Sequence, residues 1–102
     1  MAIKSFKHKG LESFFVSDDR SGLRQDHVKR IGFILDAIDS SHHPKDLKAV
    51  YGSKFSEKKG SGEGVYSLVV NGNWRITFQI KEDGAVLLDY RDYHGKQIKA
   101  IS

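Results

Sequence analysis

Three side chains that can transfer protons stand together near the end of the chain, at Asp92, Tyr93 and His94. Histidine titrates near neutral pH, tyrosine can donate a proton, and aspartate can accept one or orient a partner. The tripeptide alone does not define a site, but it could supply the acid and base of a catalysed reaction.

Cationic side chains offer a second kind of chemistry. Arg75 lies between two apolar residues in an alternating segment, and its guanidinium is a rigid fork of donors that suits phosphate. Lys58 and Lys59 lie in a glycine-rich loop that could clamp a phosphate, although the spacing is not that of a P-loop. The alternatives are a surface arginine paired with Asp89 or packed over apolar surface, and a solvated loop tip.

The remaining histidines and serines do not indicate a metal site or a nucleophile. His42 and His43 precede a proline and do not converge with a third ligand, so we expect no metal and no cofactor. His8 and His27 are predicted at the surface. The chain has no cysteine, which excludes disulfides, thiolate zinc sites and cysteine nucleophiles. No serine lies at a recognisable nucleophile turn.

Composition indicates one small basic domain spanning residues 1–102. Seventeen Lys and Arg against thirteen Asp and Glu give a net charge of +4. Domains of this kind often bind RNA, DNA or the ribosome, although a solvated basic surface is equally compatible. No apolar run approaches the roughly 20 residues of a membrane span, and no signal peptide is recognisable at the N-terminus. We therefore expect a cytoplasmic protein without membrane contact.

Hydrophobic periodicity divides the chain into a helical first half and a strand-rich second half. Apolar residues at spacings of three and four predict helices over residues 9–16 and 23–40. Residues 3–7 suggest a short strand, and Pro44 could begin a short helical turn that runs to Leu47. Strands are predicted over residues 65–70, 74–80 and 85–93.

Two tight turns would connect these last strands. Asn71-Gly72 is typical of the centre of a two-residue type I′ hairpin. For the next connection we predict a three-residue loop, 82–84, with Gly84 in the left-handed conformation. An odd-length loop is needed to place two apolar sets on one face. These sets are Trp74, Ile76 and Phe78 on one strand, and Val86, Leu88 and Tyr90 on the other.

This register predicts a polar, mostly basic face on the sheet. Arg75 lies near Arg91 on the face that also carries Asp89 and Tyr93, whereas Asp92 starts from the opposite face at the end of the sheet. The helices would cover the other face, and the loop around residues 58–60 could fold over the polar one. The predicted fold is α+β, with two to three helices on a small, mainly antiparallel sheet.

Four segments carry a resemblance to a known family: residues 3–11, 37–39, 70–78 and 89–94. Asn-Trp-Arg-Ile-Thr-Phe at 73–78 and Asp-Tyr-His at 92–94, in this order and separation, are specific motifs. They resemble the HigB-type toxins of the RelE/ParE superfamily, which belong to type II toxin–antitoxin systems. The similarity runs from residue 2 to 94, and the basic tail at 95–102 extends beyond it.

The resemblance implies a RelE-like single domain and a ribosome-dependent endoribonuclease. Such an enzyme cuts mRNA in the ribosomal A site without a metal, by attack of a ribose 2′-OH on the adjacent phosphate. The products are a cyclic phosphate and a 5′-OH, and the outcome is inhibition of translation. The implied partners are the small ribosomal subunit, mRNA and a HigA-like helix-turn-helix antitoxin, through which alone the toxin would meet operator DNA.

The resemblance also implies roles for particular residues. Arg75 matches the arginine that holds the scissile phosphate, and Lys59 matches the lysine of the family's His-Pro-Leu-Lys-Gly stretch. Asp92, Tyr93 and His94 match the terminal Asp-Tyr-His motif of the family. The catalytic set is therefore Lys59, Arg75, Asp92, Tyr93 and His94, and the predicted RNA contacts are Lys58, Arg91 and Lys96.

One departure from the family pattern leaves alternatives open. Ser56 and Glu57 stand where many relatives have histidine and proline, so one proton carrier is missing and a negative charge is added. The chain could then be a weak or silent protein that binds the ribosome and its antitoxin. A gyrase-poisoning toxin of the ParE-like branch is a further alternative, against which Arg75 and the terminal motif argue.

Overall fold

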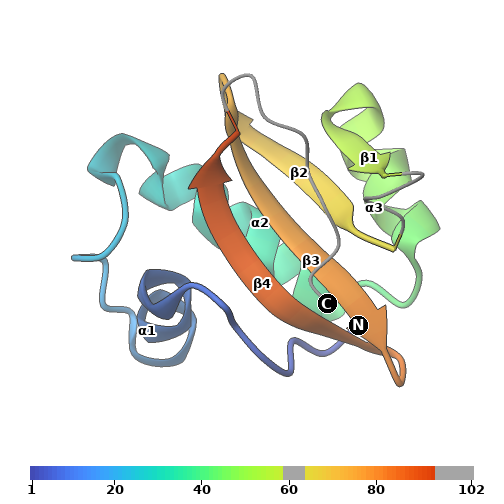
Figure 1. Ribbon diagram of the computed structural model, residues 1–102, viewed down its shortest axis with the longest axis horizontal. Coiled ribbons are helices and arrows are strands. Elements are labelled where there is room, and N and C mark those ends of the chain that lie inside the picture. The colour runs from blue at the N-terminus through green and yellow to red at the C-terminus, as the bar shows by residue number, and fades with distance from the viewer. Residues whose placement is uncertain (59–63, 94–102) are drawn as a thin grey trace.

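Four antiparallel strands form one sheet, and the longest helix lies against one of its faces (Figure 1). The computed structural model describes residues 1–58 and 64–93. In these ranges the strands follow one another in sequence order across the sheet. They are β1 (Phe55–Glu57), β2 (Tyr66–Asn71), β3 (Trp74–Lys81) and β4 (Gly84–Asp92). The helices are α1 (Lys9–Ser17), α2 (Val28–Ser40) and α3 (Pro44–Tyr51).

The helices agree with the predicted pattern in kind but differ in their bounds. α1 is close to prediction, whereas α2 begins only at Val28, because Gln25–His27 form a 3-10 turn before it. α3 extends to Tyr51, beyond the predicted short turn. Its first turn is stabilised by a capping box, in which the Asp46 carboxylate accepts the His43 N–H and the His43 ring accepts from the backbone. No helix in the described ranges is long and apolar enough to span a membrane.

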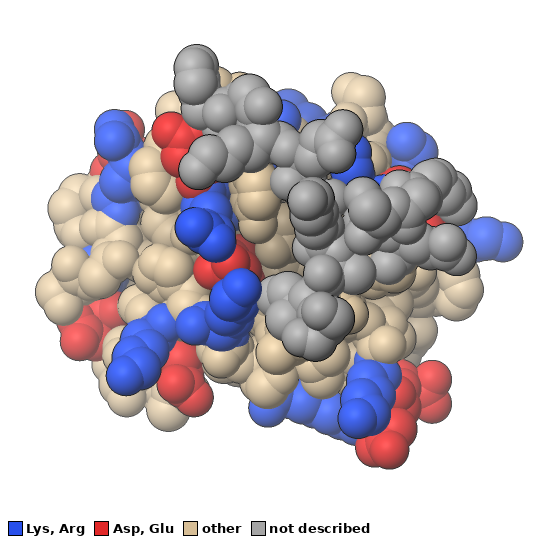
Figure 2. Space-filling model, viewed as in Figure 1, with Lys and Arg blue, Asp and Glu red and all other residues tan. Residues whose placement is uncertain are grey.

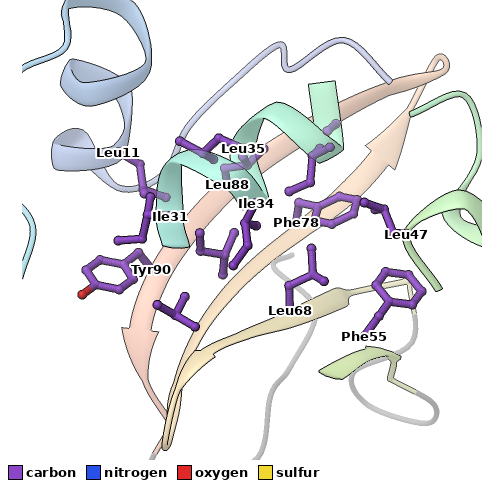
Figure 3. Close-up of a cluster of buried hydrophobic side chains, with 14 of the residues drawn as sticks. Leu11, Ile31, Ile34, Leu35, Leu47, Phe55, Leu68, Phe78, Leu88 and Tyr90 are labelled. Carbon is purple, nitrogen blue, oxygen red and sulfur yellow. The ribbon is translucent and has the colours of Figure 1, made fainter. Parts of the chain in front are cut away.

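The hydrophobic core fills the space between α2 and the sheet (Figure 3). The apolar stripe of α2 and side chains from all four strands belong to this core, while α1 closes it beside β4 and α3 closes it beside β1 (Figure 1). Fully buried members include Leu11, Ile31, Ile38, Leu47, Leu68, Ile76 and Leu88. Each such side chain stabilises the fold by about 1.5–3 kcal/mol through burial. The predicted α+β class, with helices on one face of an antiparallel sheet, is confirmed.

The turn between β2 and β3 is shifted by one residue from its predicted place. Asn71 pairs with Trp74, so Gly72 and Asn73 are the two central residues. Of these, Gly72 alone has a positive φ, +55°. Glycine accepts this conformation at little cost because it has no Cβ.

The turn between β3 and β4 differs from the prediction in length. Lys81 pairs with Gly84, which leaves only Glu82 and Asp83 in the loop. Both have positive φ, +54° and +61°, as a type I′ turn requires. The predicted three-residue loop with a left-handed Gly84 is therefore wrong.

A β-bulge in β4 restores the register that the shorter turn would otherwise destroy. Gln79 pairs with Val86 but Thr77 pairs with Asp89, so β4 carries one extra residue opposite Phe78. Leu87 lies at this point with a φ of +58°, which is unusual for a branched residue. The two-residue turn places Val86 on the face of Gln79, so its predicted position on the apolar face is wrong, whereas the bulge returns Leu88 and Tyr90 to that face.

The N-terminal segment holds the bulge from the outer edge of β4. Ser5 accepts the Leu87 N–H at its Oγ (2.9 Å) and the Leu88 N–H at its carbonyl (3.2 Å). Lys7 donates its N–H to the Leu88 carbonyl at 2.8 Å. Two isolated parallel bridges, Ile3 to Ala85 and Phe6 to Leu88, replace the continuous strand predicted over residues 3–7.

His27 is part of the core, so its predicted surface position is wrong. Its side chain is almost fully buried, with Nδ1 2.6 Å from the Tyr90 hydroxyl and edge-to-face contacts with Trp74 and Tyr90. Burial lowers the pKa of His27 below its usual 6.5, against the opposing effect of Asp26. The imidazole is therefore neutral at pH 7, and the Tyr90 hydroxyl can donate to Nδ1.

Two glycines allow the loop before α2 to touch the start of α1. A Cβ on Gly10 would lie 2.7 Å from the Gly22 carbonyl oxygen, and one on Gly22 would lie 2.8 Å from the Gly10 Cα. Both positions would meet backbone, which cannot rotate away as a flexible side chain can. The contact therefore requires glycine on both sides.

We expect Gly22→Ala to lower the free energy of unfolding by about 1–3 kcal/mol, because the added methyl would force the two backbone segments apart. Gly32→Ala is the matched control: its Cβ would meet only the Phe14 ring at 3.6 Å, in the middle of α2. Helix propensity should make this variant more stable by about 0.5–1 kcal/mol. Urea denaturation measures both, and equal effects would contradict the close contact.

The free energy of unfolding should also decrease as the pH drops below about 6.5. The reason is that His27 binds a proton more readily in the unfolded chain than in the core. The contribution is fully present above the unfolded pKa and is lost as the pH falls towards the lower folded pKa. His27→Asn should make this decline in stability shallower. Part of the decline should remain, because burial also lowers the pKa of His8. Urea midpoints between pH 7.5 and 5 test this, and an unchanged slope would refute it.

Candidate functional site

The sheet face away from α2 carries a row of small polar side chains. The backbone register places Ser67 opposite Thr77, and Thr77 opposite Asp89. Directly paired residues project to the same side of a sheet. All three side chains are buried. Ser56 continues the row on β1, where it is exposed.

Two arginines face each other in the next row. Arg75 on β3 is paired directly with Arg91 on β4, as predicted. Cβ atoms at such positions are about 5 Å apart, and like charges placed there repel each other. The ion pairs found within residues 1–58 and 64–93 involve neither arginine, so the alternative of an Arg75–Asp89 pair is not observed.

Arg75 is held at the hairpin end of the sheet. Its Nη1 donates to the Gly72 carbonyl at 2.7 Å and to the Trp74 carbonyl at 3.4 Å. These bonds involve one nitrogen of the guanidinium and fix its direction. Such a group is preorganised to receive an anion on its remaining donors, next to the exposed Arg91.

Tyr93 joins this face, whereas Asp92 lies on the other side of the strand. The Tyr93 hydroxyl is 3.5 Å from Thr77 Oγ1, and the Tyr93 N–H donates to the Asn73 carbonyl at 3.0 Å. Asp92 is paired with Trp74, one position away from Arg91, and is exposed at the end of β4. The structure thus gathers Arg75, Arg91 and Tyr93, and places Asp92 at the rim.

Of the predicted lysine and histidine contributions, only that of Lys58 falls within the described residues. Lys58 extends the β1–β2 pairing by donating its N–H to the Val65 carbonyl at 2.9 Å. By strand spacing, the Lys58 backbone lies about 16 Å from that of Arg75. Lys59, His94 and Lys96 lie outside the described residues, as does the predicted folding of the 58–60 loop over this face.

The departure at residues 56 and 57 has a clear geometry. Ser56 points to the arginine face, about 12 Å from Arg75 by strand spacing. Glu57 points to the opposite face, where it is paired with Tyr66. The side chains of these two residues are hydrogen-bonded to each other. Burial and this carboxylate raise the pKa of Tyr66. The added negative charge is therefore directed away from the arginines.

An open cleft of about 610 Å³, not predicted from the sequence, adjoins the arginine pair. Its wall is formed by the start of α1, the loop before α2 and the end of β4. The lining residues are Lys7, His8, Lys9, Gly22, Arg24, Trp74, Asp89, Tyr90, Arg91 and Asp92. In Figure 2, basic side chains gather over the α1 and β4 side of the molecule, with acidic groups between them. The basic run at Lys7 and Lys9 was visible in the sequence, but its neighbours were not.

Within the described ranges, no three His, Asp or Glu side chains converge as metal ligands. The arrangement instead offers cations, hydroxyls and a carboxylate. These groups can bind a phosphodiester and stabilise charge that develops on it.

Comparisons with known proteins agree with this arrangement. The family model described as the RelE-like toxin HigB of type II toxin–antitoxin systems matches residues 4–94. The Endoribonuclease HigB of Proteus vulgaris is 44% identical over 93 residues, covering 90% of this chain and 99% of the relative. Toxin HigB-1 of Vibrio cholerae serotype O1 is 33% identical over 90 residues, covering 87% and 94%. The chain therefore belongs to the HigB family of RelE-like toxins of type II toxin–antitoxin systems.

Proposed function

We propose that this chain is a ribosome-dependent mRNA endonuclease that cuts message in the A site and so inhibits translation. The observation that carries the proposal is the directly opposed pair Arg75 and Arg91, which has no acidic partner among the described residues. Two cations held against their mutual repulsion favour a bound anion between them. The name of the Proteus vulgaris relative, an endoribonuclease, supports RNA as that anion.

In the proposed reaction, the ribose 2′-OH attacks the adjacent phosphorus, the bond to the 5′-oxygen breaks, and a cyclic phosphate and a 5′-OH result. Negative charge grows on the phosphoryl oxygens during the attack. Arg75, with Lys59, would neutralise that charge. Asp92, Tyr93 and His94 would supply the base that takes the 2′ proton and the acid that gives one to the leaving oxygen.

Substrate positioning would come largely from the ribosome. Arg91 and Asp92 are exposed at the end of β4, so the protein alone would orient RNA weakly. Lys58, Arg91 and Lys96 would contact the RNA backbone. Membership of a type II family implies an antitoxin partner. We propose that it is a HigA-like helix-turn-helix protein, which brings the toxin to operator DNA, and that the complex acts in the cytoplasm.

Arg75→Ala should lower cleavage at least about 100-fold, because a preorganised donor to the transition state is lost. The measurement maps mRNA 5′ ends by primer extension in a purified translation reaction. Lys29→Ala removes an exposed cation from α2 and serves as the matched control. Comparable cutting by Arg75→Ala and the control would remove the central claim, provided both variants unfold at the same urea concentration.

Ser56→His should raise the cleavage rate, since an imidazole there would project onto the arginine face and add a proton carrier. Ser56→Asn adds a polar side chain without comparable titration and should leave the rate near that of the parent. If the parent is silent and Ser56→His cuts, this chain is a binder that lost its chemistry at this position. Silence of both would indicate another defect.

A further inference from the structure

The cleft beside β4 is dominated by positive charge. Lys7, Lys9, Arg24 and Arg91 line it, and all four are exposed. Burial lowers the pKa of His8, although Asp89 opposes the shift, so this ring is neutral at pH 7. The cleft therefore draws its positive charge from lysine and arginine and attracts polyanions across the physiological pH range.

The two acidic residues of the cleft do not cancel this charge. Asp89 is buried, and its Oδ1 accepts the N–H of Tyr90 at 2.9 Å. Asp92 is exposed at the end of β4. Asp26, outside the lining, forms an exposed ion pair with Arg24 at 3.3 Å. Three carboxylates, one of them engaged with backbone and one with Arg24, thus stand against four cations.

An aromatic platform lies within the same cleft. Trp74 is half-buried and packs on Tyr90 with 4.7 Å between ring centroids. The guanidinium carbon of Arg24 lies 5.7 Å from the Trp74 ring centroid. An aromatic ring flanked by cations is the arrangement that binds single-stranded nucleic acids, because a base stacks while the backbone meets positive charge.

The platform is rigid, as a binding site requires. The Tyr90 hydroxyl contacts the His27 ring and accepts a hydrogen bond from the Arg24 backbone, which ties the loop before α2 to β4. The contact between Gly10 and Gly22 fixes the same loop against α1. Little ordering would therefore accompany binding.

The cleft is continuous with the arginine pair. Arg91 lines the cleft and is also paired with Arg75, while Trp74 is the chain neighbour of Arg75. A strand whose phosphate lies between the arginines would thus have its neighbouring nucleotide at the mouth of the cleft. This continuity favours mRNA, rather than ribosomal RNA, as the ligand of the cleft. The aromatic platform favours a nucleic acid rather than an acidic peptide.

We propose that this cleft binds the nucleotide of single-stranded mRNA adjacent to the phosphate at Arg75 and Arg91, with its base stacked on Trp74 and its backbone on Lys7, Lys9 and Arg24. The proposal rests on the endonuclease function proposed above. It identifies a substrate-positioning surface, made of Lys7, Lys9, Arg24 and Trp74, that adjoins the groups that would perform the chemistry. Occupation of the cleft would set the register of the RNA along the sheet face.

Trp74 is the only tryptophan of the chain, so its fluorescence reports on the cleft directly. The probe is an eight-nucleotide single-stranded RNA with 2′-O-methyl groups, which cannot be cut. We expect it to change Trp74 emission and to bind with strong salt dependence. Anisotropy of the same RNA carrying a dye gives the affinity independently of Trp74.

The Lys7→Ala/Lys9→Ala/Arg24→Ala variant should lose affinity and reduce the log–log salt slope by about two, since each phosphate contact contributes about 0.7 for a single strand. The matched control, Lys29→Ala/Lys45→Ala/Lys48→Ala, removes as many exposed cations from α2 and α3 and should bind like the parent. Equal losses in both variants would show a general charge effect and overturn the proposal.

Further arms separate the other outcomes. Loss of pelleting with vacant ribosomes, with unchanged oligonucleotide binding, would assign the cleft to ribosomal RNA and refute the proposal. Polyglutamate that binds as tightly as RNA, with the same change in emission, would assign it to acidic peptides and also refute it. A parent that binds the RNA through the cleft but cuts no translated message would support the cleft and refute the proposed nuclease activity.

Discussion

The bulge at Leu87 is the constraint on which the rest of the sheet depends. Beyond the two-residue turn, Ile80 pairs with Ala85, and without an extra residue this register would place Arg75 opposite Tyr90. Every side chain of the far half of β4 would then change face. The bulge instead aligns Arg75 with Arg91 and keeps Tyr90 in the core. A left-handed leucine costs about 1–2 kcal/mol, which the hydrogen bonds that Leu87 and Leu88 donate to Ser5 help to offset.

The N-terminal segment therefore does more than cover an edge of the sheet. Its hydrogen bonds to Leu87 and Leu88 stabilise the bulge, and the same stretch leads into Lys7, His8 and Lys9 at the wall of the cleft. His8 caps α1 by accepting the Leu11 N–H at 3.1 Å. One segment thus couples the register of β4 to the position of the basic side chains beside it. A substitution at Ser5 would therefore alter both the alignment of the arginine pair and the positions of the basic side chains in the cleft.

One face of the sheet stabilises the fold, and the other carries the candidate site. Phe78, Ile76 and Leu68 bury themselves against the helices, and this apolar face holds the strands in place. The opposite face is polar and presents two opposed arginines, an arrangement that costs stability and that a bound anion would relieve. Glu57 lies on the helix side of the sheet, so the departure from the family pattern at this position does not place a carboxylate beside the arginines. Ser56, in contrast, projects onto the arginine face, which is why the proposed test of the chemistry is made at this position.

The α+β class, the alternation of β3 and the family could all be predicted from the sequence, because periodicity and the two motifs are local properties of the chain. It also led to the pairing of Arg75 with Arg91, but through a wrong loop length: a three-residue turn and a two-residue turn with a bulge give the same parity. The place of the extra residue was settled by tertiary contacts, because it depends on hydrogen bonds that Leu87 and Leu88 donate to Ser5, more than 80 positions away. The burial of His27 and the cleft between α1 and β4 were likewise decided by long-range contacts, among them the approach of Gly10 to Gly22. Such contacts leave no period or spacing in the chain, since they follow from how packed elements meet in space.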